Sequence, residues 1–482
     1  MKKRLIAPMA ASVATLLPSC LLKAQDAKPN VIFIFADDMT YEGAHGLGNP
    51  ELKTPNIDRL IAGGTTFVNT FNMGGWGGAI SVSSRSMLIT GRYLWNSKAL
   101  ADSKYRAPDE ARELWPQKMK DAGYQTWMTG KWHIDCVTPQ QLFDQTKDVR
   151  PGGCPPTTEA QYFRPKSRDD NSWQPWDTSF GGYWSGGRHW TEVQTDDVVN
   201  YIESHKDSKT PFFMYCAFNA PHDPRQSPRE FVDMYDVDQI ALPVNFQPEH
   251  PLKELMGCPM SMRDEKMAPF PRTEYAVKKN RQEYYAIISH FDYHLGRILD
   301  EIEKSGIAKN TIIILAADNG LSCGQHGLMG KQNMYDHSVR VPLVFCGKGI
   351  PKGEKRYCLN YMQDLVPTVY ELAGIEKPQD MQFRSLVPVL KNPKAERLPY
   401  VYGAFTASDQ RMVRNKDYKL FFIPKANTIY LFDMKKDPYE TNNLAGDPKY
   451  APVIKALAKE YAVLAREAGD KLDMRKYYPD LF

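Results

Sequence analysis

Three continuous apolar runs constrain the fold of this 482-residue chain more than any other feature: Val31–Ala36, Phe212–Ala217 and Thr311–Ala317. Unbroken apolar runs of this length are typical of strands buried on both faces of a parallel sheet. A weaker fourth run, Gln125–Thr129, follows a helix exit at Asp121-Ala122-Gly123. Between the strands, apolar residues recur at helical spacing, as in the stripe Tyr284, Ile288, Phe291, Leu295 and Ile298. Alternating strands and helices predict an α/β fold with a large, mostly parallel sheet.

The chain divides into a signal and two folded units of unequal size. We expect an export signal over residues 1–24, the main unit over 28–395 and a smaller unit over 396–482. The smaller unit has short strand-like runs at Arg411–Val413, Tyr418–Phe422 and Ile429–Phe432. It ends in an amphipathic helix over Val453–Ala468, so we expect an antiparallel sheet with a terminal helix.

The first residues predict export. A positive start at Lys2-Lys3-Arg4 precedes an apolar stretch too short for a membrane span, and cleavage after Ala24 is plausible. Leu17-Pro18-Ser19-Cys20 resembles a bacterial lipoprotein box, so lipidation of Cys20 is the alternative. Both outcomes place the mature protein outside the cytoplasm, in the periplasm or anchored at a membrane surface, without a transmembrane span.

Charge and cysteine content exclude several classes of protein. A net charge of +4 gives no support for nucleic-acid binding. The seven cysteines after Cys20 show no CxxC or Cys/His spacing, which argues against a zinc site. One surface bridge, Cys136–Cys154, is possible, but a disulfide framework is not indicated.

Polar residues with ligand-capable side chains follow each predicted strand. Such residues at the carboxyl ends of parallel strands meet in the ligand crevice of an open α/β sheet. Each could simply cap a helix or start a turn, but four such ends together favour a shared site. The residues are Asp37 and Asp38, Lys131 and His133, His222, and Asp318 and Asn319.

The segment Ser81–Arg92, with sequence SVSSRSMLITGR, carries the strongest motif. A serine-rich helix start alone indicates only an N-cap. However, the segment resembles the signature of type I sulfatases, Cys/Ser-x-Pro/Ala-x-Arg followed by Thr-Gly-Arg. In that family the first residue, here Ser81, is oxidised to formylglycine, and Arg85 is the neighbouring cation.

Other family elements follow in the same order along almost the whole mature chain. They are Asp37-Asp38, Gly130–His133, Ala220–His222, Ala317–Gly320, Gly327–Lys331 with Arg340–Pro342, and Leu431–Leu444. The chain therefore resembles exported, serine-type glycan sulfatases of Bacteroides-like bacteria. The resemblance implies an alkaline-phosphatase-like sandwich with a smaller C-terminal sheet.

The resemblance also implies a calcium site and a catalytic set. Asp37, Asp38, Asp318, Asn319 and the residue derived from Ser81 would hold the metal, a hard, all-oxygen set that suits Ca²⁺ better than Zn²⁺. Arg85, Lys131 and Lys331 would place positive charge around the sulfuryl group, helped by a helix that we expect to start near Ser84. His222 would be the general acid and His133 the base, and His326 could exchange roles with His222.

Two departures from the family pattern concern maturation. Ser81 stands where Cys is commoner, which implies a radical-SAM maturase as the partner that oxidises it. Ser83 stands where Pro or Ala is usual, which puts efficient oxidation in doubt.

The segment Cys136–Gln194 is rich in Pro, Gly and Trp and shows little periodicity, which is typical of a functional loop. We expect Trp184, Arg188 and His189 to contact a sulfated sugar, either galactose or N-acetylgalactosamine, with other host or marine glycans as alternatives. Asp336 and His337 could also line the sugar side. The alternative for the tryptophans is a small satellite core under a long loop.

Two other functions stay open from the sequence. The first is a phosphoester or phosphonate hydrolase of the same superfold. The second is a glycan-binding homologue without catalysis, whose Ser81 is never oxidised. Lysines at 131 and 331, in place of the ligands of a second metal, favour a monoanionic sulfate ester over a phosphate dianion.

Overall fold

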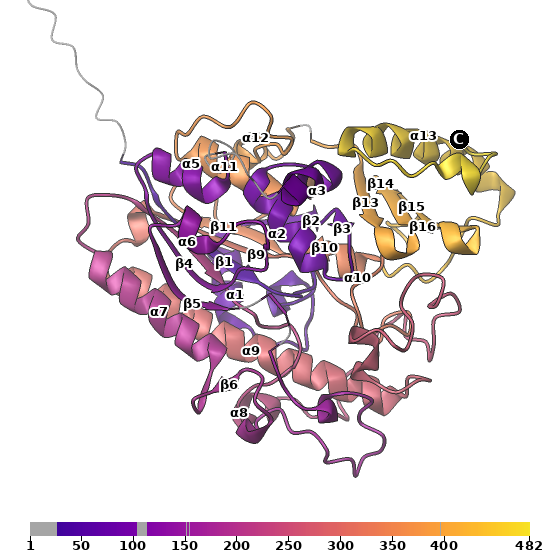
Figure 1. Cartoon of the computed structure of the whole chain (residues 1–482), viewed down its shortest axis with the longest axis horizontal. Coiled ribbons are helices and arrows are strands. Elements are labelled where there is room, and N and C mark those ends of the chain that lie inside the picture. The colour runs from indigo at the N-terminus through magenta and orange to yellow at the C-terminus, as the bar shows by residue number, and fades with distance from the viewer. Residues whose placement is uncertain (1–26, 104–112, 151, 154, 396) are drawn as a thin grey trace, which may run out of the picture.

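The computed structural model describes residues 27–103, 113–150, 152–153, 155–395 and 397–482. Its centre is a nine-stranded sheet in the order β10-β2-β11-β9-β1-β8-β4-β5, with β12 paired to β2 (Figure 1). The strands are β1 (Asn30–Ala36), β2 (Gly64–Phe71), β4 (Gln125–Lys131), β5 (Gln145–Arg150), β8 (Phe212–Ala217), β9 (Thr311–Ala317), β10 (Arg340–Val341), β11 (Leu343–Gly347) and β12 (Glu354–Tyr361). The predicted α/β fold with a large, mostly parallel sheet is confirmed.

The four apolar runs form adjacent strands in the middle of this sheet. β1 lies between β8 and β9 and runs parallel to both, with Val31 opposite Phe213 on one side and Ile312 on the other. Every residue of β1 is buried, which explains why the run lacks the alternation of a half-exposed strand. The carboxyl ends of β9, β1, β8 and β4 consequently meet at one edge of the sheet.

Helices cover both faces of the sheet, with α7 and α9 on one side and α2, α5 and α11 on the other (Figure 1). The described helices are α1 (Pro55–Gly63), α2 (Ile80–Thr90), α3 (Leu94–Ser103), α5 (Trp115–Asp121), α6 (Pro139–Leu142), α7 (Trp190–His205), α8 (Arg229–Val232), α9 (Glu274–Lys304), α10 (Asp336–Val339), α11 (Leu365–Leu372), α12 (Val387–Lys391) and α13 (Ala451–Ala468). The predicted apolar stripe lies on α9, and all five of its residues are buried. Among the described residues, no helix is long and apolar enough to span a membrane.

The segment Cys136–Gln194 is more regular than its sequence indicates. It contains β5, which pairs in parallel with β4 at the edge of the large sheet, and the first residues of α7. β5 reads QTKDVR and is only partly buried, so as an edge strand it lacks the apolar run that marks the central strands. Cys154 and residues 1–24, including Cys20, lie outside the described residues, so the proposed bridge, signal and lipid site stay predictions.

The small sheet has the order β16-β15-β14-β13-β3 and lies with α13 at one end of the molecule (Figure 1). Its strands are β3 (Gly74–Gly75), β13 (Val401–Phe405), β14 (Gln410–Arg414), β15 (Tyr418–Ile423) and β16 (Thr428–Asp433). β13–β16 are antiparallel as expected, but β3 comes from the N-terminal unit and pairs in parallel with β13. Ile80 and Met87 of α2 pack in the core of this sheet, so the two units share an interface at α2.

Buried ion pairs fasten the small sheet to the segment that follows Lys331. Asp336, on α10, contacts Arg414 of β14 and Lys419 of β15, the latter at 3.0 Å between Nζ and Oδ1. Lys419 Nζ also lies 2.6 Å from Glu440 Oε1, and the Lys419 side chain is fully buried. Since an unpaired buried charge is costly, this network fixes the position of α10 on the small sheet.

We predict that Lys419→Met lowers the free energy of unfolding by about 3 kcal/mol, because it leaves Asp336 and Glu440 partly unpaired in the interior. Chemical denaturation followed by circular dichroism measures the change. Lys435→Met is the matched control, since Lys435 pairs with Asp417 at the surface, and its unfolding curve should match that of the parent. Equal curves for both variants would contradict the prediction.

Candidate active site

The predicted site residues lie at the carboxyl edge of the central strands. Asp37 and Asp38 directly follow β1, Asp318 directly follows β9, and Lys131 ends β4. His222 lies five residues beyond β8, in the turn after Ala217. All five side chains are buried, with exposed fractions between 0% and 5%. The sheet therefore brings together residues that lie up to 281 positions apart in sequence.

Each of the three carboxylates at this edge has a buried cation as its partner. Lys131 Nζ donates to Asp37 Oδ2, Lys331 Nζ donates to Asp38 Oδ2 at 2.7 Å, and Arg85 Nε donates to Asp318 Oδ2 at 3.0 Å. Burial alone would raise the pKa of Asp37, but the charges of Lys131, His222 and Arg85 hold it well below its usual range. The pKa of Asp318 is raised by burial and by the neighbouring charge of Asp37.

Ser81 lies among these groups in the first turn of α2. The helix begins at Ile80, so the predicted start near Ser84 is wrong by one turn, and Ser81 itself lies at the helix N-terminus. Its Oγ donates to Asp37 Oδ1 at 3.1 Å and lies 3.4 Å from Lys131 Nζ and 3.5 Å from Asn319 Oδ1. A group bound at Ser81 therefore meets both the positive end of a helix and an ammonium ion.

Arg85 is held one helical turn beyond Ser81, on the same face of α2. Its side chain is fully buried, its Nη1 donates to Lys131 O at 3.0 Å, and its Cζ lies 4.6 Å from the centre of the Phe35 ring. Its Nη2 has no hydrogen-bond partner among the described residues and lies 3.9 Å from Asp37 Oδ1. An unpaired buried donor of this kind can bind an oxygen atom of an anionic substrate.

The oxygen-rich cluster fits a divalent cation. Asp37, Asp38 and Asp318 supply buried carboxylates, and Asn319 lies against them with its Nδ2 2.6 Å from Asp38 Oδ1. Burial and the charge of Asp37 raise the pKa of Asp318, and a bound dication would favour its ionised form. Carboxylate and amide oxygens are the ligands that Ca²⁺ prefers.

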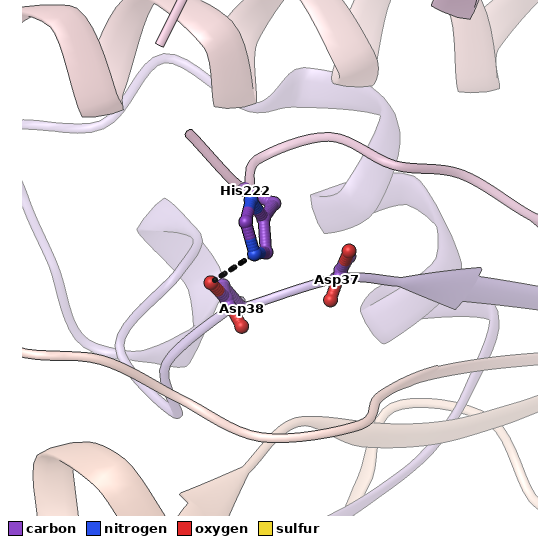
Figure 2. Close-up of side chains that lie close together, drawn as sticks. All are labelled: Asp37, Asp38 and His222. Carbon is purple, nitrogen blue, oxygen red and sulfur yellow. Dashed lines mark ion pairs between the residues drawn. The ribbon is translucent and has the colours of Figure 1, made fainter. Parts of the chain in front are cut away.

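His222 points at Asp38 and lies near Asp37 (Figure 2). Its Nε2 lies 3.5 Å from Asp38 Oδ2, and ligand atoms of His222, Asp37 and Asp38 all lie within 4.8 Å of one another. Its Nδ1 lies 2.7 Å from Asp223 O and 3.1 Å from Asp223 Oδ1. The ring is thus fixed at one nitrogen and presents the other to the site, where it can act as a metal ligand or as a proton donor.

His133 is a neutral imidazole beside this cluster. Burial and then the charges of Lys131 and Arg85 lower the pKa of His133 to about 2. Its buried Nδ1 has no hydrogen-bond partner among the described residues. Gly152 packs directly on the ring, since a Cβ added to Gly152 would lie 1.9 Å from His133 Cδ2. The backbone at Gly152 therefore sets the position of this neutral imidazole.

A cavity of about 300 Å³ gives access to Ser81. Its described lining contains four predicted residues, Ser81, His133, His222 and Lys331. It also contains residues that the sequence did not indicate: Gly78, Ala79, Gly152, Gly153, Met262, Arg263, Asp264 and Gln332. Arg263 and Asp264 lie at the start of a short 3-10 helix before α9, in a stretch without periodicity or motif, so no local signal marks them.

The structure does not bring the predicted sugar-contacting residues of the tryptophan-rich segment to this cavity. Trp184 donates its Nε1 to Pro175 O, and Arg188 is an exposed partner of Glu192 and Asp196. His189 is 1% exposed, bonds Gln226 O through Nε2 and caps α7 through Nδ1. The His189 ring therefore makes its contacts inside the fold, beside Tyr183 and Trp184.

Asp336, His337 and His326 are also displaced from the expected place. Asp336 belongs to the buried ion pairs with the small sheet, and Asp336 and His337 line a different cavity, of about 280 Å³. The His326 ring stacks on Tyr335 with 3.9 Å between centroids and does not line the Ser81 cavity. Its exchange of roles with His222 is therefore not supported by this geometry.

The fold and this site define a hydrolase of the sulfatase class. The family model described as "Sulfatase" matches residues 29–375, and a second model, "N-sulphoglucosamine sulphohydrolase, C-terminal", matches residues 324–467. The chain belongs to the sulfatase family and is a sulfuric ester hydrolase.

Known proteins that resemble the chain extend over nearly its whole length. It is 27% identical to the N-acetylglucosamine-6-O-sulfatase of Bacteroides thetaiotaomicron, over 94% of this chain and 89% of the relative. It is 26% identical to an ulvan-active sulfatase of Formosa agariphila, over 99% and 90%. A solved structure of a protein in complex with its substrate D-glucosamine-2-N,6-O-disulfate superimposes with a TM-score of 0.72 at 23% identity, covering 92% of this chain and 99% of that one.

We predict that Gly152→Ala lowers kcat about a hundredfold, because the new methyl group displaces the His133 ring by an ångström or more. Hydrolysis of an aryl sulfate measures the loss, and unchanged circular dichroism shows that the fold is kept. The adjacent Gly153→Ala is the control, since a Cβ there meets no atom within 4 Å. Parallel losses in both variants would show that His133 is not the cause.

Proposed function

We propose that the chain hydrolyses sulfate esters of a glycan, with a formylglycine derived from Ser81 as the nucleophile and Ca²⁺ as the metal. The observation that carries the proposal is the position of Ser81 Oγ. It lies at the N-terminus of α2, 3.1 Å from Asp37 Oδ1 and 3.4 Å from Lys131 Nζ, and it lines the cavity. A helix N-terminus and buried cations both stabilise negative charge, so these surroundings suit a sulfuryl group.

The aldehyde of formylglycine, once hydrated, would supply one hydroxyl that attacks sulfur as the sulfur–oxygen bond to the sugar breaks, and a second hydroxyl whose deprotonation expels sulfate and restores the aldehyde. Unmodified Ser81 has one hydroxyl and could not expel sulfate from its own ester. The Ser81 side chain is 1% exposed in the folded chain, so we expect its oxidation to precede folding. A serine at this position implies a radical-SAM maturase as the partner.

The metal site would consist of Asp37, Asp38, Asp318 and Asn319, together with the oxygen of residue 81. When bound, a dication orients a sulfate oxygen and offsets the charge of the carboxylates. Lys331 and Lys131 hold Asp38 and Asp37 in place and add positive charge for the sulfuryl oxygens. Arg85 Nη2, which has no hydrogen-bond partner among the described residues, would be a further donor to the sulfuryl oxygens.

The two histidines divide the proton transfers. His133, kept neutral by burial and by Lys131, accepts a proton from a hydroxyl of residue 81. His222 lies with its Nε2 3.5 Å from Asp38 Oδ2 and is held by Asp223 through Nδ1. From this position His222 donates a proton to the leaving sugar oxygen.

The glycan assignment rests on the relatives, which include an N-acetylglucosamine-6-O-sulfatase and ulvan-active sulfatases. A glycan substrate of this kind would be met outside the cytoplasm. The predicted signal over residues 1–24, or a lipid at Cys20, would place this chain there, in the periplasm or at the outer surface.

We predict that co-expression with an anaerobic radical-SAM maturase lowers the mass of the peptide that contains Ser81 by about two mass units, the change from serine to aldehyde. Turnover of an aryl sulfate should rise at least about a hundredfold over protein made without the maturase, since a serine ester is not released. Ser81→Ala, made with the maturase, is the inactive control. Equal activity of matured and unmatured protein would refute the formylglycine proposal, and faster turnover of an aryl phosphate would favour the phosphoester alternative.

Removal of metal should lower both activity and stability. We expect Ca²⁺ added to chelated protein at about a hundred times its Kd to raise the free energy of unfolding by about 3 kcal/mol. Asp318→Asn should remove most of this gain, whereas Asp300→Asn, at the exposed partner of Arg59, should keep it. Thermal unfolding with Ca²⁺, Mg²⁺ and Zn²⁺ measures the effect, and a larger gain with Zn²⁺ would contradict the assignment of calcium.

A further inference from the structure

A tyrosine of α9 supports the turn that carries Asp38. Tyr284 is 3% exposed and belongs to the apolar stripe of this helix. Its hydroxyl donates to Asp38 O at 2.7 Å and accepts from Thr40 N at 3.1 Å. Within the described part of the chain, neither the Asp38 carbonyl nor the Thr40 amide has another hydrogen-bond partner. The hydroxyl therefore satisfies the buried backbone at both ends of this turn.

The backbone of the turn is held in an unfavourable conformation. Asp38 has a φ of 65°, in the left-handed region that glycine adopts readily and that other residues adopt where their surroundings hold them. In this conformation the Asp38 carboxylate binds Lys331 Nζ and lies 2.6 Å from Asn319 Nδ2. The Asp38 amide donates to Asp318 Oδ1 at 3.2 Å. The direction of a predicted metal ligand therefore depends on the shape of this turn.

The Tyr284 ring is fixed on its own helix. Its centre lies 5.5 Å from Cζ of the buried Arg225. Arg225 Nη1 in turn donates to Asn280 Oδ1 at 3.2 Å, one turn before Tyr284 on α9. The hydroxyl consequently meets the Asp38 turn from a rigid element, which is the arrangement that positions a site precisely.

Other side chains of α9 hold the segment that follows the turn. Ser289 Oγ donates to Lys53 O at 2.8 Å, and Asp292 Oδ1 accepts from Ile57 N at 2.7 Å. These bonds do not involve Tyr284, so they remain when its hydroxyl is removed. We therefore expect the effect of losing the hydroxyl to be confined to the turn.

We propose that Tyr284 is a positioning residue of the metal site, whose hydroxyl holds Asp38 in the orientation that binds the cation. Without the hydroxyl, a buried carbonyl and a buried amide lose their partner, and a change of φ at Asp38 also turns its carboxylate. Groups that orient metal ligands contribute to metal affinity although they do not touch the ion. Tyr284 does not line the Ser81 cavity, so it acts through Asp38. The inference rests on the proposed calcium site.

Calcium titration of two matched variants tests this role on protein with unmodified Ser81. Tyr284→Phe removes the hydroxyl and keeps the ring, and we expect calorimetry to give a Kd for Ca²⁺ that is higher by about tenfold or more. Tyr285→Phe is the control, because Tyr285 is 2% exposed on the same helix but its hydroxyl donates to Glu51 Oε2 at 2.9 Å. Its Kd should match that of the parent. An unchanged Kd in Tyr284→Phe, or equal losses in both variants, would overturn the proposal.

Hydrogen exchange of the parent gives a second test, which decides the question even if Tyr284→Phe does not fold. The Thr40 amide donates to the Tyr284 hydroxyl, so its exchange rate reports opening of the turn. We expect Ca²⁺ to slow this exchange about tenfold more than that of the Lys53 amide, which donates to the hydroxyl of Tyr235 at 2.9 Å. Equal effects of Ca²⁺ on the two amides would show that the turn is not coupled to the metal.

Kinetics on matured protein separate this inference from the function that it rests on. Tyr284→Phe should need about tenfold more Ca²⁺ than the parent for half-maximal hydrolysis of an aryl sulfate, and saturating Ca²⁺ should restore most of kcat. A substitution that only lowers stability would not shift the calcium requirement. Matured parent protein that binds Ca²⁺ but hydrolyses no sulfate would refute the reaction at Ser81 and leave the role of Tyr284 to the titration. Hydrolysis with the same calcium requirement in parent and variant would refute only the role of Tyr284.

Discussion

The pairing of three buried carboxylates with three buried cations is the interaction on which the rest of the site depends. Asp37, Asp38 and Asp318 are placed side by side by parallel strands, and without partners their repulsion in a low-dielectric interior would be costly. Lys131, Lys331 and Arg85 offset part of this cost. The same cations surround Ser81, so the groups that stabilise the carboxylates are also those that can stabilise an anionic ester.

Distant parts of the chain hold these cations in place. Arg85 belongs to α2, whose other face packs into the core of the small sheet through Ile80 and Met87. Lys331 lies five residues before Asp336. Asp336 is the first residue of α10 and is buried against the small sheet, where it pairs with Lys419. The C-terminal unit therefore acts on the site without lining its cavity, by fixing two segments that carry charge to Ser81.

The central fold could be predicted because its signals are local. β1, β8 and β9 are continuous apolar runs, and the polar residues after them mark one edge of the sheet. Edge strand β5 was missed because a strand exposed on one side has no such run. The start of α2 was misplaced by a turn because serines at 81, 83 and 84 offer several possible N-caps.

The sequence by itself determined the chemistry of the core: a serine in a sulfatase signature, carboxylates after buried strands, and the cations and histidines that accompany them. Only the tertiary structure decided which polar side chains face the cavity. His189 and Asp336 are chemically suited to bind sugar, but the fold uses both for internal contacts. Arg263 and Asp264 lie in a segment without a pattern, yet they reach the cavity. Side-chain direction in irregular segments follows from long-range packing, which leaves no period in the local sequence.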